Sequence, residues 1–164
     1  MNIFYLDPLP YNCSKCHFDK HISKLLLESV QMLSTAIWCV DPLIAEDLYK
    51  FGGIYQPTHI NHPSNKWARQ SLANFLWLRN LVLHLNEEKK YRFNSGNHKA
   101  MEIIISLPFP SIKNIKFTDP PQCMPEHLKC EDTVTAYRNY YMSEDKNYMA
   151  KWTKREAPEW WNIK

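Results

Sequence analysis

The sequence predicts a mainly α protein, folded as a single compact helical domain with a short extended N-terminal segment. Three observations predict this fold class. Two long stretches carry apolar residues at helical spacing, alternation typical of a strand is confined to residues 2–6, and prolines and glycines gather between the apolar stretches. The 164 residues are enough to bury a core without disulfides or metal ions, so we expect one domain over residues 1–164.

The first part of the chain is expected to hold an extended segment and two helices. The extended residues 2–6 stop at Asp7-Pro8. The first helix runs from about residue 12 or 13 to residue 37, because apolar side chains would cover most of its circumference. Asp41 as N-cap and Pro42 at the first helical position start a brief helix, which Gly52-Gly53 ends.

The middle of the chain is expected to supply the central packing helix. Residues 52–65 form a loop dense in Gly, Pro, Asn and His. Ser64 or Asn65 then caps the longest helix, which continues to about Lys90 through a mostly apolar sequence. A further helix over about residues 97–106 ends at the prolines of LPFP.

The last third is expected to be a loop followed by short helices. Residues 107–129 are rich in proline and lack periodicity, so we expect a long loop. Asp132 or Thr133 caps a helix through Tyr137 and Tyr141, and Ser143 caps another through Trp152. Residues 130–164 thus form a C-terminal region of helices rich in aromatic and basic residues.

The composition limits the possible classes of function. Apolar residues make up 45% and charged residues 23%, as in a globular protein. The net charge of +3 permits nucleic-acid or nucleotide binding without requiring it. No apolar run of membrane-spanning length and no secretory signal is present, so we expect no membrane partner and a cytoplasmic protein, in the host cytoplasm if the chain is phage-encoded.

The first long helix carries a polar seam inside its apolar surface. At about 100° per residue, an arc of roughly 80° holds His17, His21, Lys24, Glu28, Gln31 and Thr35. Because an unpaired charge bordered by apolar residues is costly to bury, the seam is either a functional cleft or a paired structural network. In a cleft, Glu28 acts as general acid or base. Burial raises its pKa, whereas Lys24 or protonated His21 lowers it, so these two residues tune it.

The cysteines allow a metal-binding alternative. Cys13, Cys16, His17 and His21 have donor types that zinc accepts, with Cys123 and Cys130 as distant partners. A haem attachment at Cys13-x-x-Cys16-His17 would need an export route, for which the sequence shows no signal. The competing interpretation is that these are reduced thiols near a helix start. We assign no metal and no cofactor.

Ligand-binding residues are expected in three further regions. His59, Asn61 and His62 lie in the loop before the central helix, and Arg92, His98 and Lys99 form a small basic group that could hold phosphate. In the C-terminal region, aromatic side chains could stack on bases while basic groups meet phosphates. The expected ligand-binding residues are His17, Gln31, Asn61, His62, Arg69, Arg92, His98, Lys99, Tyr137, Arg138, Tyr141, Trp152 and Arg155. Of these, we expect Tyr137, Tyr141 and Trp152 inside, and Arg138 and Arg155 at the ligand.

Three pieces of the chain resemble a known family. The pieces are MNIFYLDP followed by DKHISKLLLESVQML, then NHPSNKW with the apolar helix after it, then EEKKYRF. Together they resemble the pyrimidine-dimer DNA glycosylase superfamily, the phage endonuclease V-like proteins. The likeness covers about residues 1–100, so residues 1–106 are the family-like core, and it consists of short motifs.

The resemblance implies a mostly helical DNA repair enzyme that cleaves the glycosidic bond of a damaged pyrimidine. In that family the N-terminal amine attacks and a glutamate on the first long helix assists, and by its place in the motif that glutamate resembles Glu28. The segment AYRNYY is similar in kind to the family's aromatic-basic end. Family members lose the initiator methionine before a small residue, but Asn2 is not small, so either the amine of Met1 itself serves or imine chemistry is absent.

We therefore expect a protein that acts on nucleic acid or nucleotides, most specifically an enzyme similar to N-glycosylases, with DNA or a nucleotide as its ligand. A second hypothesis is a phage protein that keeps the cleft to bind DNA or sequester a nucleotide without chemistry. A third is a helical protein whose seam is only a polar network or a partner interface.

Overall fold

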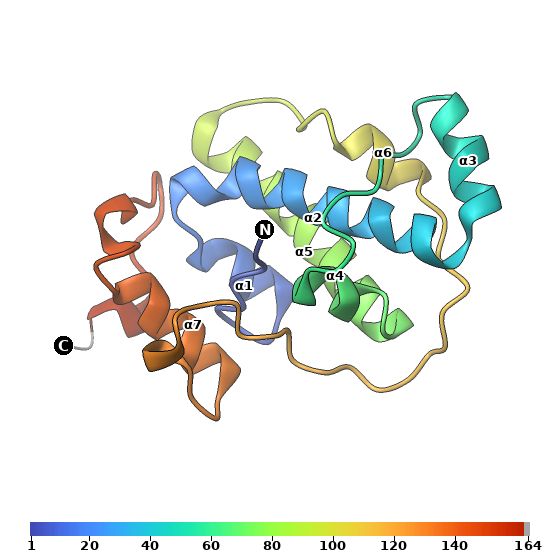
Figure 1. Ribbon diagram of the computed structural model, residues 1–164. Coiled ribbons are helices and arrows are strands. Elements are labelled where there is room, and N and C mark those ends of the chain that lie inside the picture. The colour runs from blue at the N-terminus through green and yellow to red at the C-terminus, as the bar shows by residue number, and fades with distance from the viewer. Residues whose placement is uncertain (163–164) are drawn as a thin grey trace.

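The computed structural model describes residues 1–162 and is built from helices joined by irregular segments (Figure 1). No strand occurs among the described residues, so the predicted mainly α fold is confirmed. The α-helices are α1 (Pro10–Cys16), α2 (Asp19–Val40), α3 (Pro42–Lys50), α4 (Pro63–Ala68), α5 (Leu72–Phe93), α6 (Met101–Ser106) and α7 (Thr133–Met142). Short 3-10 turns follow at Glu126–Leu128, Asn147–Met149 and Glu159–Asn162.

Helices α2 and α5 form the centre of the molecule. They pack against one another along their length, α1 packs on α5, and α3 and α4 pack on α2 (Figure 1). Their facing sides supply fully buried apolar residues such as Leu26, Leu33, Leu78 and Leu85. The chain from α7 onward covers the end of the molecule where α2 begins. Burial of this continuous apolar surface is the main term that stabilises the fold.

The first predicted helix is two helices, which corrects the expectation of a single one from residue 12 or 13 to residue 37. His17 and Phe18 adopt extended backbone angles between α1 and α2. The carbonyl groups at the end of α1 find other donors here: the guanidinium of Arg92 donates to Lys15 and His17, and the indole of Trp152 donates to Cys16. Because tertiary donors satisfy these carbonyl groups, the helix can end without a local stop signal.

The predicted longest helix is likewise broken, into α4 and α5, with residues 69–71 between them. His62, rather than Ser64 or Asn65, is the N-cap of α4, and its Nδ1 accepts from the backbone of Ser64. Ser71 caps α5 through its hydroxyl, which accepts from the backbone of Asn74. A serine cap within the apolar stretch is therefore what starts α5.

The remaining elements follow the expectations in part. Helix α3 and the α7 cap at Asp132 are as predicted, since the Asp132 carboxylate accepts from the backbone of Thr135. Helix α6 begins later than expected, at Met101. The helix expected from Ser143 through Trp152 is wrong, because only Asn147–Met149 turns there, as a 3-10 turn. Ser143 donates its hydroxyl back to the carbonyl of Tyr140 instead of capping a new helix.

The N-terminal segment is buried and irregular. Residues 3–6 are buried, and Phe4 adopts a left-handed backbone conformation with φ of 51°. The Asn2 side chain stabilises this bend by accepting from the backbone N–H groups of Ile3 and Phe4. Such a conformation is uncommon for an aromatic residue and persists only where the surroundings hold it. Among the described residues, none of the helices has the length and apolar character needed to span a membrane.

Candidate functional site

The carboxylate of Glu28 lies between two cations in the middle of the polar seam. Its Oε2 is 4.0 Å from the α-amine of Met1, and its Oε1 is 3.9 Å from Nζ of Lys24. The Glu28 side chain is 20% exposed, whereas that of Lys24 is 63% exposed. Glu28 is thus neither in bulk water nor closed off, and it sits beside the N-terminus of the chain.

The side chain of Asn2 holds the N-terminus in this place. Its Nδ2 donates to the carbonyl of Cys123 at 2.7 Å, and its Oδ1 accepts from the hydroxyl of Tyr137 at 2.9 Å. The Tyr137 hydroxyl also contacts the proline-rich loop at Pro121 and Cys123. Asn2 therefore ties Met1 to the loop and to α7.

Helix α4 supplies the other wall beside Met1. Asn65 is buried, and its Nδ2 donates to the carbonyls of Thr58 and His59 while lying 3.3 Å from Sδ of Met1. Its Oδ1 is buried with no hydrogen-bond partner among the described residues. Burial lowers the pKa of His62, and the positive Met1 amine and His59 lower it further, although Glu28 opposes them. Asn65 was expected only as a helix cap; its place in the NHPSN motif is the signal that could have marked it.

His21 occupies the buried end of the seam. Its Nδ1 lies 2.6 Å from the hydroxyl of Tyr141, which is also 2.9 Å from Nδ1 of His17. Burial lowers the pKa of His21 to about 4, with Lys146 and Lys24 adding to the effect. Burial also lowers the pKa of His17. Both imidazoles are therefore neutral near pH 7, which corrects the alternative that a protonated His21 acts on Glu28.

The N-terminal bend brings an aromatic side chain and a further cation to this end. The ring of Phe4 stacks on His21 with 4.9 Å between ring centroids, and Nζ of Lys146 lies 5.8 Å from the centroid of Phe4. The same Nζ lies 5.1 Å from the ring centroid of Tyr140. Sequence reasoning missed this arrangement, because it depends on the left-handed turn at Phe4.

Within residues 1–162, the cysteine and histidine residues near α1 are not grouped as metal ligands. No group of three or more His, Cys, Asp or Glu side chains in the described part of the chain has the geometry to hold a metal ion. Burial raises the pKa of Cys13 to about 12 and also raises the pKa of Cys16. The zinc alternative therefore has no geometric support within residues 1–162.

Two arginines expected at the ligand are engaged in a structural network instead. Arg92 is 1% exposed and donates to Glu88 and Asp19 as well as to the carbonyls at the end of α1. Arg155 donates to the other oxygen of Glu88 at 2.6 Å. Burial raises the pKa of Glu88, but hydrogen bonds from Arg155 and Arg92 outweigh it and hold the pKa below its usual value. The structure keeps these arginines away from Glu28.

The C-terminal residues divide between the interior and the surface. Tyr137 and Tyr141 are buried, in line with the expectation that they lie inside, whereas Trp152 is only half-buried. Arg138 donates to the carbonyl of Leu6 and lies over the ring of Trp160. Arg138 is thus held by protein partners.

The remaining expected residues lie at separate places. Gln31 follows Glu28 on α2 and is half-buried, and Asn61 is exposed in the loop before α4. Arg69 donates to the carbonyl of Ile60. His98 accepts from the backbone of Ala100 at the start of α6, and Lys99 is exposed there. Among these residues, His62 is near enough to the Met1 amine and Glu28 for both charges to affect its pKa.

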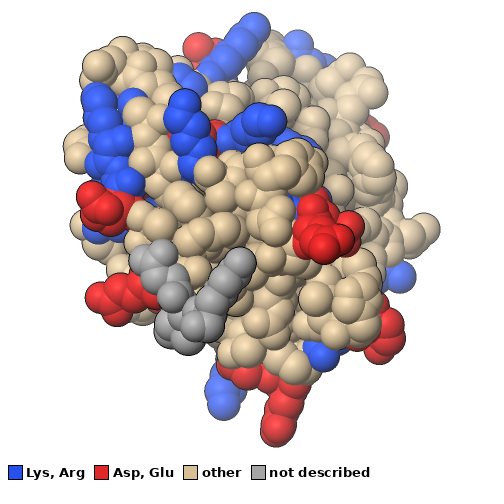
Figure 2. Space-filling model, turned by 90° about the vertical axis from the view of Figure 1, so that its left-hand side faces the viewer, with Lys and Arg blue, Asp and Glu red and all other residues tan. Residues whose placement is uncertain are grey.

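One face of the molecule gathers positive charge. Figure 2 shows lysine and arginine side chains clustered in the upper part of the face that carries α7 and the start of α2. Lys20 and Lys24 lie at the start of α2, and Lys146 and Lys151 lie in the segment that follows α7. Among them, Lys24 alone has a carboxylate partner within the described residues. Such a face is suited to phosphate groups.

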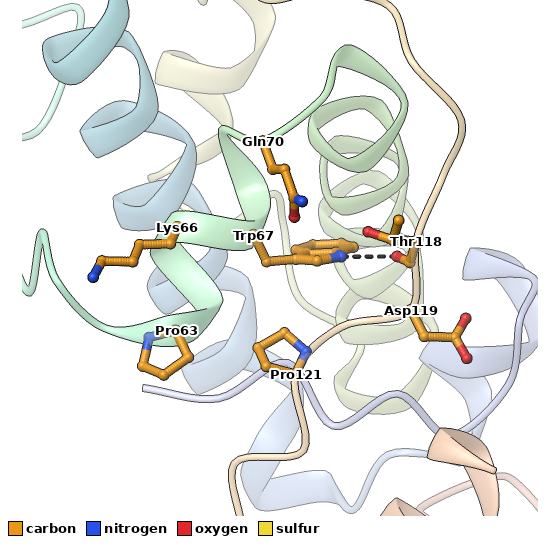
Figure 3. A pocket seen from close by; sticks show the side chains of 7 residues that line it. All are labelled: Pro63, Lys66, Trp67, Gln70, Thr118, Asp119 and Pro121. Atoms are coloured by element: carbon orange, nitrogen blue, oxygen red, sulfur yellow. Dashed lines mark hydrogen bonds between the residues drawn. The ribbon is translucent and has the colours of Figure 1, made fainter. Parts of the chain in front are cut away.

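A pocket of about 670 Å³ lies between α4 and the proline-rich loop (Figure 3). Trp67 forms its floor and donates its indole N–H to the carbonyl of Thr118. Lys66 and Asp119 lie on opposite sides, with Gln70 above the indole. The pocket does not include Glu28 among its lining residues, so it is distinct from the site at Met1.

Comparisons with protein-family models, with curated proteins and with solved structures found no match.

Proposed function

We propose that the protein is an N-glycosylase-like enzyme that cleaves a base–sugar bond in modified or damaged DNA or in a nucleotide, with Glu28 as general acid/base. The observation that carries this proposal is the partly exposed Glu28 carboxylate between the Met1 amine and Lys24. A carboxylate in contact with solvent but flanked by cations can both take up a proton and stabilise positive charge on a sugar.

Glu28 can assist two forms of attack on the anomeric carbon. In the first, water attacks, Glu28 takes its proton, and the base leaves with the electron pair of the C–N bond. In the second, the Met1 amine gives a proton to Glu28 and attacks the anomeric carbon, and the base leaves with the electron pair of the C–N bond. The ring C–O bond then breaks, the ring oxygen takes up the proton held by Glu28, and an imine to Met1 remains. Lys24 stabilises the carboxylate in both routes, and His21 lies farther along the same helix face.

The charge of the neighbouring face supports a ligand with phosphate groups. Lys20 lies in the first turn of α2, and Lys146 and Lys151 lie in the segment after α7; none of the three forms an ion pair within residues 1–162. Exposed cations of this kind neutralise phosphate and release counterions, which makes binding depend on salt. The proposed orientation places the phosphates over this face and the sugar near Glu28.

The test is the substitution Glu28→Gln, which removes the ionisable group while keeping the size of the side chain. We expect base release from DNA containing pyrimidine dimers or other modified bases to be abolished, while DNA binding stays within about twofold, since a lost general acid/base costs roughly 10²–10⁴ in rate. Base release is measured by chromatography and binding by fluorescence anisotropy.

The matched control is Glu87→Gln, which changes a carboxylate on α5 that is 65% exposed and pairs only with Lys90. This variant should keep full activity. Undiminished base release by Glu28→Gln would overturn the proposed function. Borohydride added during the reaction separates the two routes, because it traps an imine at Met1 and leaves the water route without an adduct.

A second function, binding of a nucleotide without chemistry, is favoured by the Trp67 pocket. Its volume of about 670 Å³ lies within the usual range for small-ligand sites, and it is separate from Glu28. Incubation with candidate nucleotides followed by heating distinguishes the two functions. Intact recovered nucleotide and loss of binding in Trp67→Leu would support binding, whereas altered nucleotide would support catalysis.

A further inference from the structure

A chain of polar side chains runs through the core from α1 to His21. Sγ of Cys13 lies 3.8 Å from Nε2 of His17. Nδ1 of His17 and Nδ1 of His21 both contact the single hydroxyl of Tyr141, at 2.9 and 2.6 Å. All four side chains are buried, with at most 3% of any of them exposed. Because these side chains are buried, each hydrogen bond between them needs one donor atom that carries the hydrogen and one acceptor atom.

The direction of the chain follows from the carbonyl of Phe4. The thiol of Cys13 donates to this buried carbonyl at 3.5 Å, and no other donor to it occurs among the described residues. With its hydrogen used there, Cys13 is an acceptor toward His17, so Nε2 of His17 carries the hydrogen. Nδ1 of His17 is then a bare acceptor and receives the hydroxyl hydrogen of Tyr141.

The single hydrogen of the Tyr141 hydroxyl also sets the tautomer of His21. Since the Tyr141 hydroxyl donates to His17, it can only accept from His21, and Nδ1 of His21 must carry a hydrogen. A neutral imidazole has one hydrogen, so Nε2 of His21 is bare. This nitrogen has no partner within residues 1–162, and it is absent from the buried unpartnered atoms there, which are Asn65 Oδ1, Arg69 Nη1, Arg79 Nε and Trp160 Nε1. It therefore reaches the surface.

We propose that Cys13, His17 and Tyr141 are positioning residues that hold His21 as the Nδ1–H tautomer, so that Nε2 presents a lone pair to an uncharged N–H or O–H donor of the ligand. The Nε2–H tautomer is the usual one for a histidine in water, so the protein has to impose this state. His21 lies two helical turns before Glu28 on the same face of α2, with Lys146 and Lys24 near it, so this acceptor lies on the same side of α2 as the proposed ligand site. Its use by a ligand rests on the proposed function, but the tautomer does not.

The tautomer is measured directly by two-dimensional NMR of protein with ¹⁵N-labelled histidine near pH 7, without any ligand. The bare nitrogen of each ring resonates far downfield of the protonated one, and the pattern of couplings tells Nδ1 from Nε2. The signals of His21 and His17 are assigned by their loss in His21→Gln and His17→Gln. We expect the Nδ1–H form for His21 and the Nε2–H form for His17.

Tyr141→Phe removes only the shared hydroxyl, and we expect His21 to change to the Nε2–H form in this variant. Tyr140→Phe is the matched control, since its hydroxyl lies on the next residue and contacts neither histidine; His21 should keep the Nδ1–H form. An Nε2–H form of His21 in the unaltered protein would overturn the proposal even if Tyr141→Phe failed to fold. The tautomer test is independent of the test of catalysis. Loss of base release in Glu28→Gln would not restore a tautomer assignment that the NMR spectrum contradicts. Absence of base release in the unaltered protein would not contradict an Nδ1–H form of His21.

Discussion

At the scale of the residue, the buried side chain of Arg92 connects three helices. Its guanidinium is fully enclosed, yet it meets a carboxylate on its own helix, another on α2 and two carbonyls at the end of α1. The fork of donors on an arginine suits such a junction better than a lysine would. Arg92 therefore joins α5 to the break between α1 and α2.

Arg92→Met keeps an unbranched side chain but removes every donor. We expect a loss of roughly 3–5 kcal/mol in the free energy of unfolding, because Asp19 and the carbonyls of Lys15 and His17 lose their partner in the interior. Urea denaturation measures this. Lys90→Met, which breaks an exposed pair with Glu87, should cost at most about 1 kcal/mol. Equal losses in the two variants would contradict the structural role of Arg92.

At the same scale, the positions of the polar residues on α2 could be predicted from the sequence, but their distant contact partners could not. The helical period alone places His21, Lys24 and Glu28 on one face, as the structure has them. The approach of the Met1 amine to Glu28 depends on a buried bend at Phe4 and on hydrogen bonds to Asn2. Nothing in the local sequence encodes contacts between such distant residues.

At the scale of the element, caps decide where helices start, and breaks depend on more distant groups. The cap of α7 at Asp132 was predicted correctly because its signal lies within a few residues of the helix start. The break after α1 has no local signal, since its carbonyls are satisfied by Arg92 and Trp152. The second cap, Ser71, was present in the sequence but was masked by continuous apolar spacing.

Asp132→Ala tests how firmly α7 is anchored at its start. We expect a loss of about 1 kcal/mol in the free energy of unfolding, since the backbone N–H of Thr135 loses its acceptor. Asn139→Ala, at an exposed position of the same helix, should change stability by less than about 0.5 kcal/mol. Urea denaturation of both variants gives the comparison, and an unchanged stability for Asp132→Ala would mean that tertiary packing alone sets the start of α7.

At the scale of the whole molecule, two buried neutral histidines make folding depend on pH. The pKa of His21 falls from an ordinary 6.5 to about 4 on folding, mainly through burial, and the pKa of His17 is lowered as well. Below pH 6.5, His17 and His21 bind protons in the unfolded chain but stay neutral in the folded protein. The stability is therefore complete above pH 6.5 and is lost as the pH falls toward about 4.

We expect the free energy of unfolding to decrease by roughly 1.4 kcal/mol per pH unit for each of the two histidines within this window. His21→Gln should make the dependence shallower, whereas His127→Gln, at an exposed position in the Glu126–Leu128 turn, should leave it unchanged. Urea denaturation across the window measures the slopes. A stability that does not change between pH 6.5 and 4 would contradict the buried neutral state of His17 and His21.

Local sequence patterns are enough to specify the helical class, the apolar character of the long helices α2 and α5, and the shared face of His21, Lys24 and Glu28. Each of these follows from local periodicity and from caps within a few residues of the helices they start. Three sets of contacts arise from the tertiary structure alone. Met1 approaches Glu28, Arg92 and Arg155 pair with Glu88, and Tyr141 contacts both His17 and His21. These contacts join residues far apart in the chain, and their geometry exists only once the helices have packed.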